Sequence, residues 1–158
     1  MELCDIFDKH GTPTGRIVER GTELSPDEFY LVVQVWIQDE HNNYLIQQRG
    51  RHLESGPGIW ATTAGYVLAG EQSIDGAIRE VKEELGIQLS LRQLTRMDRH
   101  TLDNRVEDVW VANVIKDSIK PIPGDEVADC KWVSKPELAE MVDHGSFFRY
   151  SYITTMLK

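Results

Sequence analysis

Apolar residues recur along the chain in two patterns, one typical of strands and one typical of helices. Residues 30–38 are rich in β-branched and aromatic types, and the polar stretch after them predicts a hairpin with residues 44–48. Residues 50–58 form a polar, glycine-rich loop. Shorter apolar runs predict further strands at 3–7, 16–19, 60–64, 91–99, 106–115 and 127–133.

Helical periodicity first appears from about residue 74 to residue 85. Ser73 is placed to act as its N-cap, and Gly86 stands where a left-handed residue commonly ends a helix. Ser134 and Pro136 predict the start of a second helix, and residues 147–157 predict a third. No repeat or long linker divides residues 1–158. Strands with helices between and after them predict a single domain, an α+β or α/β sandwich.

Composition narrows the classes of protein that this chain can represent. With 41% apolar and 27% charged residues over 158 positions, the chain is typical of a globular domain. It has no membrane-length apolar run and an acidic first segment, so a cytoplasmic location is the default expectation. Cys4 and Cys130 form no Cys-x-x-Cys pair and are expected to be reduced thiols.

The formal net charge of −9 disfavours binding to nucleic acid through a basic face. An acidic protein that handles phosphates needs local cations, either arginine and lysine side chains or a bound metal. The acidic excess is therefore weak support for a metal site.

Three glutamates gather on one side of the first predicted helix. Because each helical residue advances by about 100°, Glu80, Glu83 and Glu84 share an arc that lies away from the apolar stripe. Their mutual repulsion costs a few tenths of a kcal/mol per pair, and the helix C-terminus also disfavours anions. A hard dication on this arc would explain the pattern, since Mg²⁺ and Mn²⁺ prefer carboxylate oxygens. The alternative from these residues alone is a solvated acidic face.

The flanking residues favour the metal interpretation. Arg79 precedes Glu83 by one helical turn and can orient its carboxylate. Upstream, a glycine-containing loop includes Gly65 and Glu71. From Gly65 onward the segment matches every fixed position of the Nudix box, the loop–helix–loop signature of the Nudix superfamily: Gly65-x5-Glu71-x7-Arg79-Glu80-Val81-x-Glu83-Glu84-x-Gly86-Ile87.

Beyond this box the chain resembles the branch of the superfamily that includes isopentenyl-diphosphate isomerase. The likeness covers nearly the whole length, although its motifs outside the box are much less specific. It is carried by the 30–48 hairpin, the Gly56-Pro57-Gly58-Ile59-Trp60 run and the Asp129-Cys130-Lys131-Trp132-Val133 run.

The resemblance implies an α/β/α sandwich around a mixed sheet and a hydrolase that cleaves a diphosphate linkage with Mg²⁺ or Mn²⁺. By position in the box, Glu80 and Glu84 are the expected metal ligands, and Glu83 is a further ligand or helps to activate water. Arg79 is expected to orient the carboxylates, and the carbonyl of Gly65 is a further ligand position. Nucleoside diphosphates or their derivatives are the leading substrate class.

Residues outside the box supply the remaining candidates. Glu126 is the first candidate for the general base, and Glu107 is the second. Arg49 and Arg51 are candidates for contacts with substrate phosphates, although both fit equally well as solvent-exposed loop residues. Three aromatic residues can stack on a base but are more commonly core residues: Trp36, Trp60 and Tyr66.

Two other functions compete with hydrolysis. An isomerase acting on isopentenyl diphosphate needs a cysteine in the strand before the box, and residues 60–65 contain none. In addition, Tyr30 stands where a ligand histidine is expected, and Arg105 replaces the first member of an acidic pair that ends at Glu107. A non-catalytic nucleotide-binding module is the other alternative, but its box would be expected to have lost glutamates. The expected partner is a small diphosphate, and a homodimer is left open.

Overall fold

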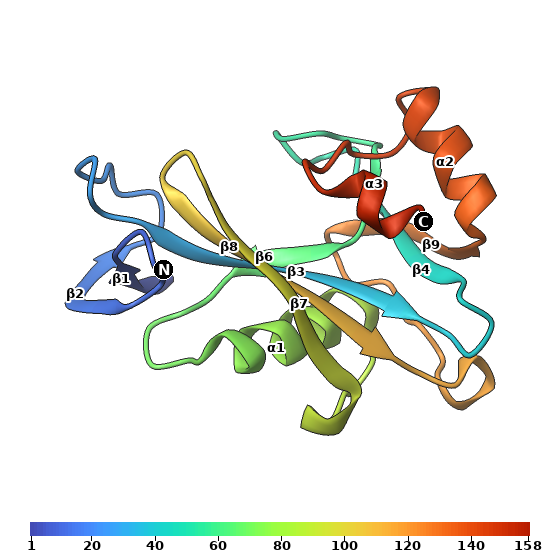
Figure 1. Cartoon of the computed structure of the whole chain (residues 1–158), viewed down its shortest axis with the longest axis horizontal. Coiled ribbons are helices and arrows are strands. Elements are labelled where there is room, and N and C mark those ends of the chain that lie inside the picture. The colour runs from blue at the N-terminus through green and yellow to red at the C-terminus, as the bar shows by residue number, and fades with distance from the viewer.

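The computed structural model describes residues 1–158 and shows a central mixed β-sheet with helices on both sides (Figure 1). This arrangement confirms the α/β/α sandwich. The elements are β1 (Leu3–Phe7), β2 (Pro13–Glu19), β3 (Tyr30–Gln38), β4 (Tyr44–Arg49), β5 (Trp60–Ala61), β6 (Thr63–Tyr66), α1 (Ser73–Leu85), η1 (Leu91–Gln93), β7 (Leu94–Leu102), β8 (Arg105–Asn113), η2 (Lys116–Ser118), β9 (Val127–Val133), α2 (Lys135–Asp143) and α3 (Ile153–Met156).

Strand β3 organises the sheet. Along its whole length it pairs in parallel with β8, which pairs in turn with β7. Its other edge is shared, because β6 pairs antiparallel with Val32–Val35 and β4 pairs only with Ile37 and Gln38. The predicted hairpin between β3 and β4 is therefore present but short. Beyond it β4 departs from β3 and pairs with β5 and β9.

The two faces of β3 bury separate cores, which explains its continuous apolar sequence. Successive strand residues point to opposite faces. Leu31, Val33, Val35 and Ile37 pack with α1 in the larger cluster. Trp36 faces the other way and packs with residues of α2 and α3 in the second cluster. A strand buried on both faces shows no alternation between apolar and polar residues, as the sequence of β3 illustrates.

Helix α1 lies along one face of the sheet with the predicted stripe directed inward. Ala77, Val81 and Leu85 are fully buried, and Gly86 adopts the expected left-handed conformation with φ 65°. The N-cap differs from the prediction. Gln72 takes that position, because the hydroxyl of Ser73 is engaged with β8 and donates a 2.6 Å hydrogen bond to the carboxylate of Asp108.

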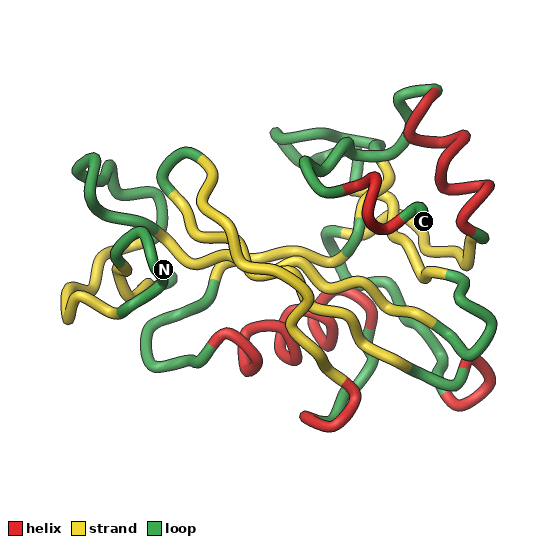
Figure 2. Tube along the Cα trace, in the orientation of Figure 1, coloured by secondary structure: helices red, strands yellow, loops and turns green.

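Strands β1 and β2 form a separate two-stranded sheet at one end of the molecule (Figure 2). Cys4, Ile6 and Val18 bury a small core against Tyr30 at the start of β3. The backbone of the hairpin also meets the loop before α1, where the amide of Ala69 donates to the carbonyl of Leu3 over 2.8 Å. This N-terminal hairpin is thereby fixed beside the glycine-containing loop of the box.

The C-terminal segment differs most from the sequence prediction. A helix was expected over residues 147–157, but α3 covers only Ile153–Met156. Residues before it hydrogen-bond to the sheet instead, since the amide of Phe148 donates to the carbonyl of Trp60. Tyr150 and Tyr152 surround the buried indole of Trp36. No helix is long and apolar enough to cross a membrane. Both cysteines are free, as expected.

Candidate active site

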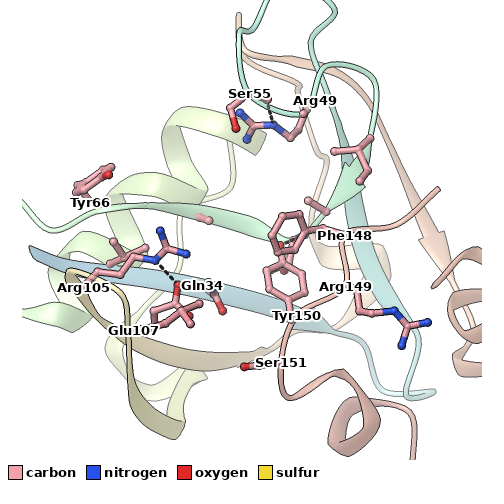
Figure 3. Close-up of a pocket in the computed structure, with 17 residues that line it drawn as sticks. Gln34, Arg49, Ser55, Tyr66, Arg105, Glu107, Phe148, Arg149, Tyr150 and Ser151 are labelled. Atoms are coloured by element: carbon pink, nitrogen blue, oxygen red, sulfur yellow. Dashed lines mark hydrogen bonds and ion pairs between the residues drawn. The ribbon is translucent and has the colours of Figure 1, made fainter. Parts of the chain in front are cut away.

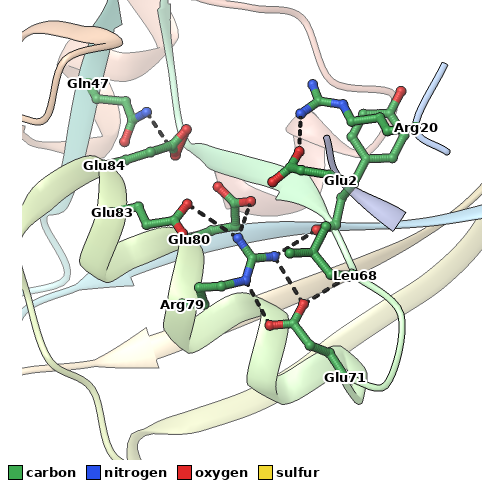
Figure 4. A network of polar contacts seen from close by, with 10 residues as sticks. Glu2, Arg20, Gln47, Leu68, Glu71, Arg79, Glu80, Glu83 and Glu84 are labelled. Carbon is green, nitrogen blue, oxygen red and sulfur yellow. Dashed lines mark hydrogen bonds and ion pairs between the residues drawn. The ribbon is translucent and has the colours of Figure 1, made fainter. Parts of the chain in front are cut away.

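Arg79 is the centre of the polar network on the exposed side of α1 (Figure 4). Its guanidinium donates to both carboxylate oxygens of Glu71, at 2.7 and 3.0 Å, and to Glu80 at 2.9 Å. Further hydrogen bonds reach Glu83 at 3.2 Å and the carbonyl of Tyr66 at 2.8 Å. Arg79 therefore contacts three carboxylates, among them Glu83, which its spacing places within reach, and its role in orienting them stays a prediction. Glu71 is held by Arg79 and takes no part in lining the nearby cavity.

Glu80 lies directly against the backbone of Gly65 in β6. A Cβ atom at position 65 would stand 2.1 Å from the carboxyl carbon of Glu80, so only glycine leaves room for this approach. Burial and the neighbouring Glu83 raise the pKa of the Glu80 carboxyl to about 7, despite its hydrogen bond from Arg79. The approach of Glu80 thus explains on steric grounds why glycine occupies position 65 of the box. That the carbonyl of Gly65 binds a metal stays a prediction.

Glu84 is the most strongly perturbed carboxylate. Its side chain accepts a 3.2 Å hydrogen bond from the amide nitrogen of Gln47 in β4 and has no cationic partner. Burial, followed by repulsion from Glu80, raises the pKa of Glu84 to about 8. Two half-buried carboxylates on successive turns, of which only Glu80 is paired with a cation, are costly, and a bound cation would relieve that cost.

The loop between β8 and β9 brings two more carboxylates to the same place. Its backbone attaches to the end of α1, where Gly124 donates to the carbonyl of Glu84 over 2.9 Å. A Cβ at Gly124 would lie 2.3 Å from the carbonyl oxygen of Glu83, so the close packing depends on this glycine. The next two residues, Asp125 and Glu126, then face the carboxylates of α1 across a shared cavity.

This carboxylate cavity has a volume of about 400 Å³ and no apolar residue in its lining. The structure brings together four of the predicted residues here, namely Glu80, Glu83, Glu84 and Glu126. Sequence reasoning missed three others. Asp125 had a local signal, since it adjoins Glu126, whereas the other two belong to the N-terminal hairpin and had none. The full lining is Glu2, Arg20, Glu80, Glu83, Glu84, Asp125 and Glu126.

The donor set of the cavity fits a hard dication. It offers six carboxylates and a single guanidinium, and oxygen ligands of this kind are those that Mg²⁺ and Mn²⁺ prefer. No three of the carboxylates converge closely enough to form a complete coordination sphere. Arg79 holds Glu80 and Glu83 in their present orientation. Coordination therefore requires some of these side chains to rotate toward one another.

A second, larger cavity of about 530 Å³ lies near the C-terminal segment (Figure 3). Two residues that the sequence predicted for the active site line this cavity. Arg49 lines it and donates to the carbonyl of Ser55, and Glu107 is held there by Arg105 at 2.6 Å and His100 at 2.8 Å. Neither residue lines the carboxylate cavity, and Arg51 lines neither cavity.

The three aromatic candidates have different surroundings. Trp36 is fully buried and is a core residue, and Trp60 packs partly buried at the edge of the second core. Tyr66 alone lines the larger cavity. The guanidinium of Arg20 lies 4.5 Å from the centre of the Tyr66 ring. Arg20 lines the carboxylate cavity, so this contact joins a residue of one cavity to a residue of the other.

Comparison with known proteins gives consistent matches. The family model of the NUDIX domain matches residues 29–152. A Nudix hydrolase of Listeria monocytogenes is 33% identical, with 99% of this chain and 94% of that protein covered. An isopentenyl-diphosphate Delta-isomerase of Streptomyces avermitilis is 26% identical, with 87% and 74% covered.

Solved structures match at the level of the fold. DR0079 from Deinococcus radiodurans superposes with a TM-score of 0.77 at 16% identity, with 98% of this chain and 97% of that chain covered. An Ap4A hydrolase from C. elegans gives a TM-score of 0.59 at 20% identity, with 81% and 92% covered.

Proposed function

The chain belongs to the Nudix family, and we propose that it is a metal-dependent hydrolase that cleaves the phosphoanhydride bond of a nucleoside diphosphate-linked substrate. The observation that carries this proposal is the carboxylate cavity. Glu80 and Glu84 are half-buried there without enough positive charge to balance them, and four further carboxylates line the same space. The likeness to Nudix hydrolases supports hydrolysis as the class of reaction.

The charged residues of α1 have separate tasks in this proposal. Glu80 and Glu84 would hold the dication, with Glu83 as a further ligand. When bound, Mg²⁺ or Mn²⁺ supplies neutralisation of the diphosphate and lowers the pKa of a coordinated water. Arg79 maintains the orientation of Glu80 and Glu83 from the side of the cavity.

Glu126 is proposed as the general base that takes the proton from the attacking water. It lines the carboxylate cavity and takes part in no ion pair, so its carboxylate is available to accept a proton. Glu107, the second candidate, is engaged by Arg105 and His100 in the other cavity. The geometry therefore favours Glu126 over Glu107.

The contact between Arg20 and Tyr66, which links residues of the two cavities, suggests how an elongated substrate fits. The carboxylate cavity, with its dication, suits the diphosphate. The larger cavity contains apolar residues together with Gln34 and Arg105 and suits the organic part of the substrate. Tyr66, which lies at this contact, is then expected to touch the substrate near the bond between these parts.

The first test is a substrate panel. Nucleoside di- and triphosphates, nucleotide sugars, dinucleotides and prenyl diphosphates should be assayed for released phosphate or nucleoside monophosphate, with Mg²⁺ and with Mn²⁺. Hydrolysis that requires the metal and favours nucleoside diphosphate derivatives supports the proposal. Interconversion of the two prenyl diphosphate isomers would favour the isomerase alternative, and binding without turnover would favour a non-catalytic module.

The second test is a substitution in the cavity. Glu84→Gln should lower kcat by about two orders of magnitude or more, because it removes a negatively charged metal ligand. Glu140→Gln on α2 is the matched control, since Glu140 is an exposed helical glutamate outside both cavities. Near-normal turnover of Glu84→Gln would remove the metal assignment. Glu126→Gln tests the base separately, and an unchanged rate there means that another group takes the proton.

A further inference from the structure

Arg20 is the only cationic residue that lines the carboxylate cavity. It follows β2 in the N-terminal hairpin, outside residues 29–152 that match the NUDIX domain. A diphosphate that enters this cavity meets six carboxylates. Two dications would offset only four of these negative charges, and the substrate brings more. A positive side chain at the cavity wall is therefore needed where the phosphates bind.

The guanidinium of Arg20 is held on two sides while most of its donors stay free. Glu2 accepts a 2.8 Å hydrogen bond from one terminal nitrogen, and the guanidinium lies over the Tyr66 ring. No other side-chain hydrogen bond from Arg20 is formed. Figure 4 shows Arg20 and Glu2 together beside Glu80. The guanidinium of an arginine in this position can donate hydrogen bonds to two phosphate oxygens at once.

The contact with Glu2 is easily exchanged for a phosphate. The two side chains are 53% and 43% exposed, and ion pairs at such positions contribute little to stability. The contact with Tyr66 does not compete with a phosphate, because it involves no hydrogen bond and leaves the N–H groups of Arg20 as donors. Glu2 thus keeps Arg20 in place without blocking it.

The hairpin that carries Arg20 is itself fixed relative to the box. The amide of Gly70 donates to the carboxylate of Asp5 over 2.9 Å, and the amide of Arg20 donates to the carbonyl of Glu2 over 2.9 Å. The side chains of Cys4 and Ile6, which belong to β1 of the hairpin, are fully buried against Tyr30. The position of Arg20 is therefore set by the folded structure and does not depend on a mobile terminus.

We propose that Arg20 binds the diphosphate of the substrate, replacing its contact with Glu2 by contacts with phosphate oxygens. This inference rests on the proposed function and adds a residue of the N-terminal hairpin to the substrate site. It assigns to Arg20 the phosphate contact that sequence analysis had assigned to Arg49 and Arg51.

The test measures binding of methylenediphosphonate, a diphosphate that cannot be hydrolysed, by titration calorimetry in Mg²⁺. Arg20→Ala should weaken binding by about tenfold or more, because a charge-assisted contact is lost. Arg16→Ala is the matched control. Arg16 lies on β2 of the same hairpin and pairs with Glu28, but it lines neither cavity. Its affinity should equal that of the wild type. Arg20→Lys keeps the charge without the guanidinium and should fall between the two.

Glu2→Gln separates substrate binding from a purely structural role. If Arg20 binds phosphate, removing its competitor should leave the affinity unchanged or raise it by a fewfold. If the pair only stabilises the hairpin, Glu2→Gln and Arg20→Ala should weaken binding equally, and that result would overturn the proposal. Thermal unfolding of each variant shows whether it is folded at the temperature of the binding experiment. If Arg20→Ala is not folded, the affinities of Arg20→Lys and Glu2→Gln decide whether Arg20 binds phosphate.

The outcomes also separate this inference from the proposed function. A wild-type protein that hydrolyses diphosphates while Arg20→Ala binds the diphosphonate equally well overturns the role of Arg20 alone. A wild-type protein that neither binds the diphosphonate nor hydrolyses any member of the panel overturns both. With the natural substrate, Arg20→Ala should raise KM.

Discussion

The carboxylate of Glu84 is expected to destabilise the metal-free protein, so its removal should stabilise the fold while it abolishes activity. Burial and repulsion from Glu80 raise the pKa of Glu84 from 4.5 to about 8. One pKa unit corresponds to about 1.4 kcal/mol. Ionised Glu84 therefore costs the folded protein on the order of 5 kcal/mol relative to the unfolded chain.

The sign of the effect fixes its pH dependence. The folded state holds the proton of Glu84 more tightly than the unfolded chain does. The resulting stability is fully present below pH 4.5 and is lost as the pH rises to about 8, the folded-state pKa. The pKa of Glu80, raised by burial to about 7, gives a contribution of the same sign. The metal-free wild type should thus become less stable from mildly acidic to alkaline pH.

Glu84→Gln should remove most of this loss. At about pH 5 the two proteins should agree within about 1 kcal/mol, since glutamine is neutral like the protonated acid and can keep the hydrogen bond from Gln47. At about pH 9 the variant should be more stable by roughly 2–5 kcal/mol. Urea denaturation in EDTA at both pH values measures the difference, and Glu140→Gln should follow the wild type.

Added Mg²⁺ should narrow the difference in stability between the wild type and the variant. Binding to the folded wild type adds about 2.7 kcal/mol at a concentration one hundred times Kd. The variant, which lacks one ligand, should gain less. Parallel stability profiles of the wild type and Glu84→Gln across this pH range would refute the reasoning, because Glu84 would then be ionised without cost.

Substitutions at four further positions test other parts of the structure. Arg79→Ala should lower the free energy of unfolding by about 3–5 kcal/mol, since it leaves partly buried carboxylates unpaired, and Arg79→Lys should recover only part of this in urea denaturation. Gly65→Ala should reduce kcat by about tenfold or more without loss of helix content in circular dichroism, because its Cβ displaces the carboxylate of Glu80; an unchanged kcat would contradict this. Trp36→Ala should cost about 3–5 kcal/mol, while Phe148→Ala, at a 46% exposed residue, should cost less than about 1 kcal/mol.

Local patterns predicted the elements that depend on neighbouring residues. The bounds of β3 and β9 agree with the sequence prediction, and the inward stripe of α1 follows from helical periodicity. The gathering of Glu80, Glu83 and Glu84 has the same origin, since one helix carries all three. Glu126, the first candidate for the general base, lines the same cavity, and the hydrogen bonds that place it there could not be predicted from the sequence.

Contacts between distant segments were beyond the reach of sequence patterns. Arg20 reaches the carboxylate cavity because the N-terminal hairpin docks beside the box, and no periodicity in residues 1–28 signals that contact. Arg49 lies in the other cavity because the loop after β4 folds toward the C-terminal segment. The predicted third helix was too long because tertiary packing of Tyr150 and Tyr152 around Trp36 outweighed local helical preference.

The buried thiol of Cys4 makes attachment of the N-terminal hairpin a measurable event. Cys4, in strand β1 of the hairpin, is 1% exposed because it packs against Tyr30, and burial raises the pKa of its thiol. A thiol-specific reagent can therefore modify Cys4 only when the hairpin detaches, whereas the partly exposed Cys130 reports general access. If Arg20 holds bound diphosphate, ligand should slow the labelling of Cys4 and leave that of Cys130 unchanged. The rate at which Cys4 is labelled would then report how often the hairpin that carries Arg20 detaches from the rest of the substrate site.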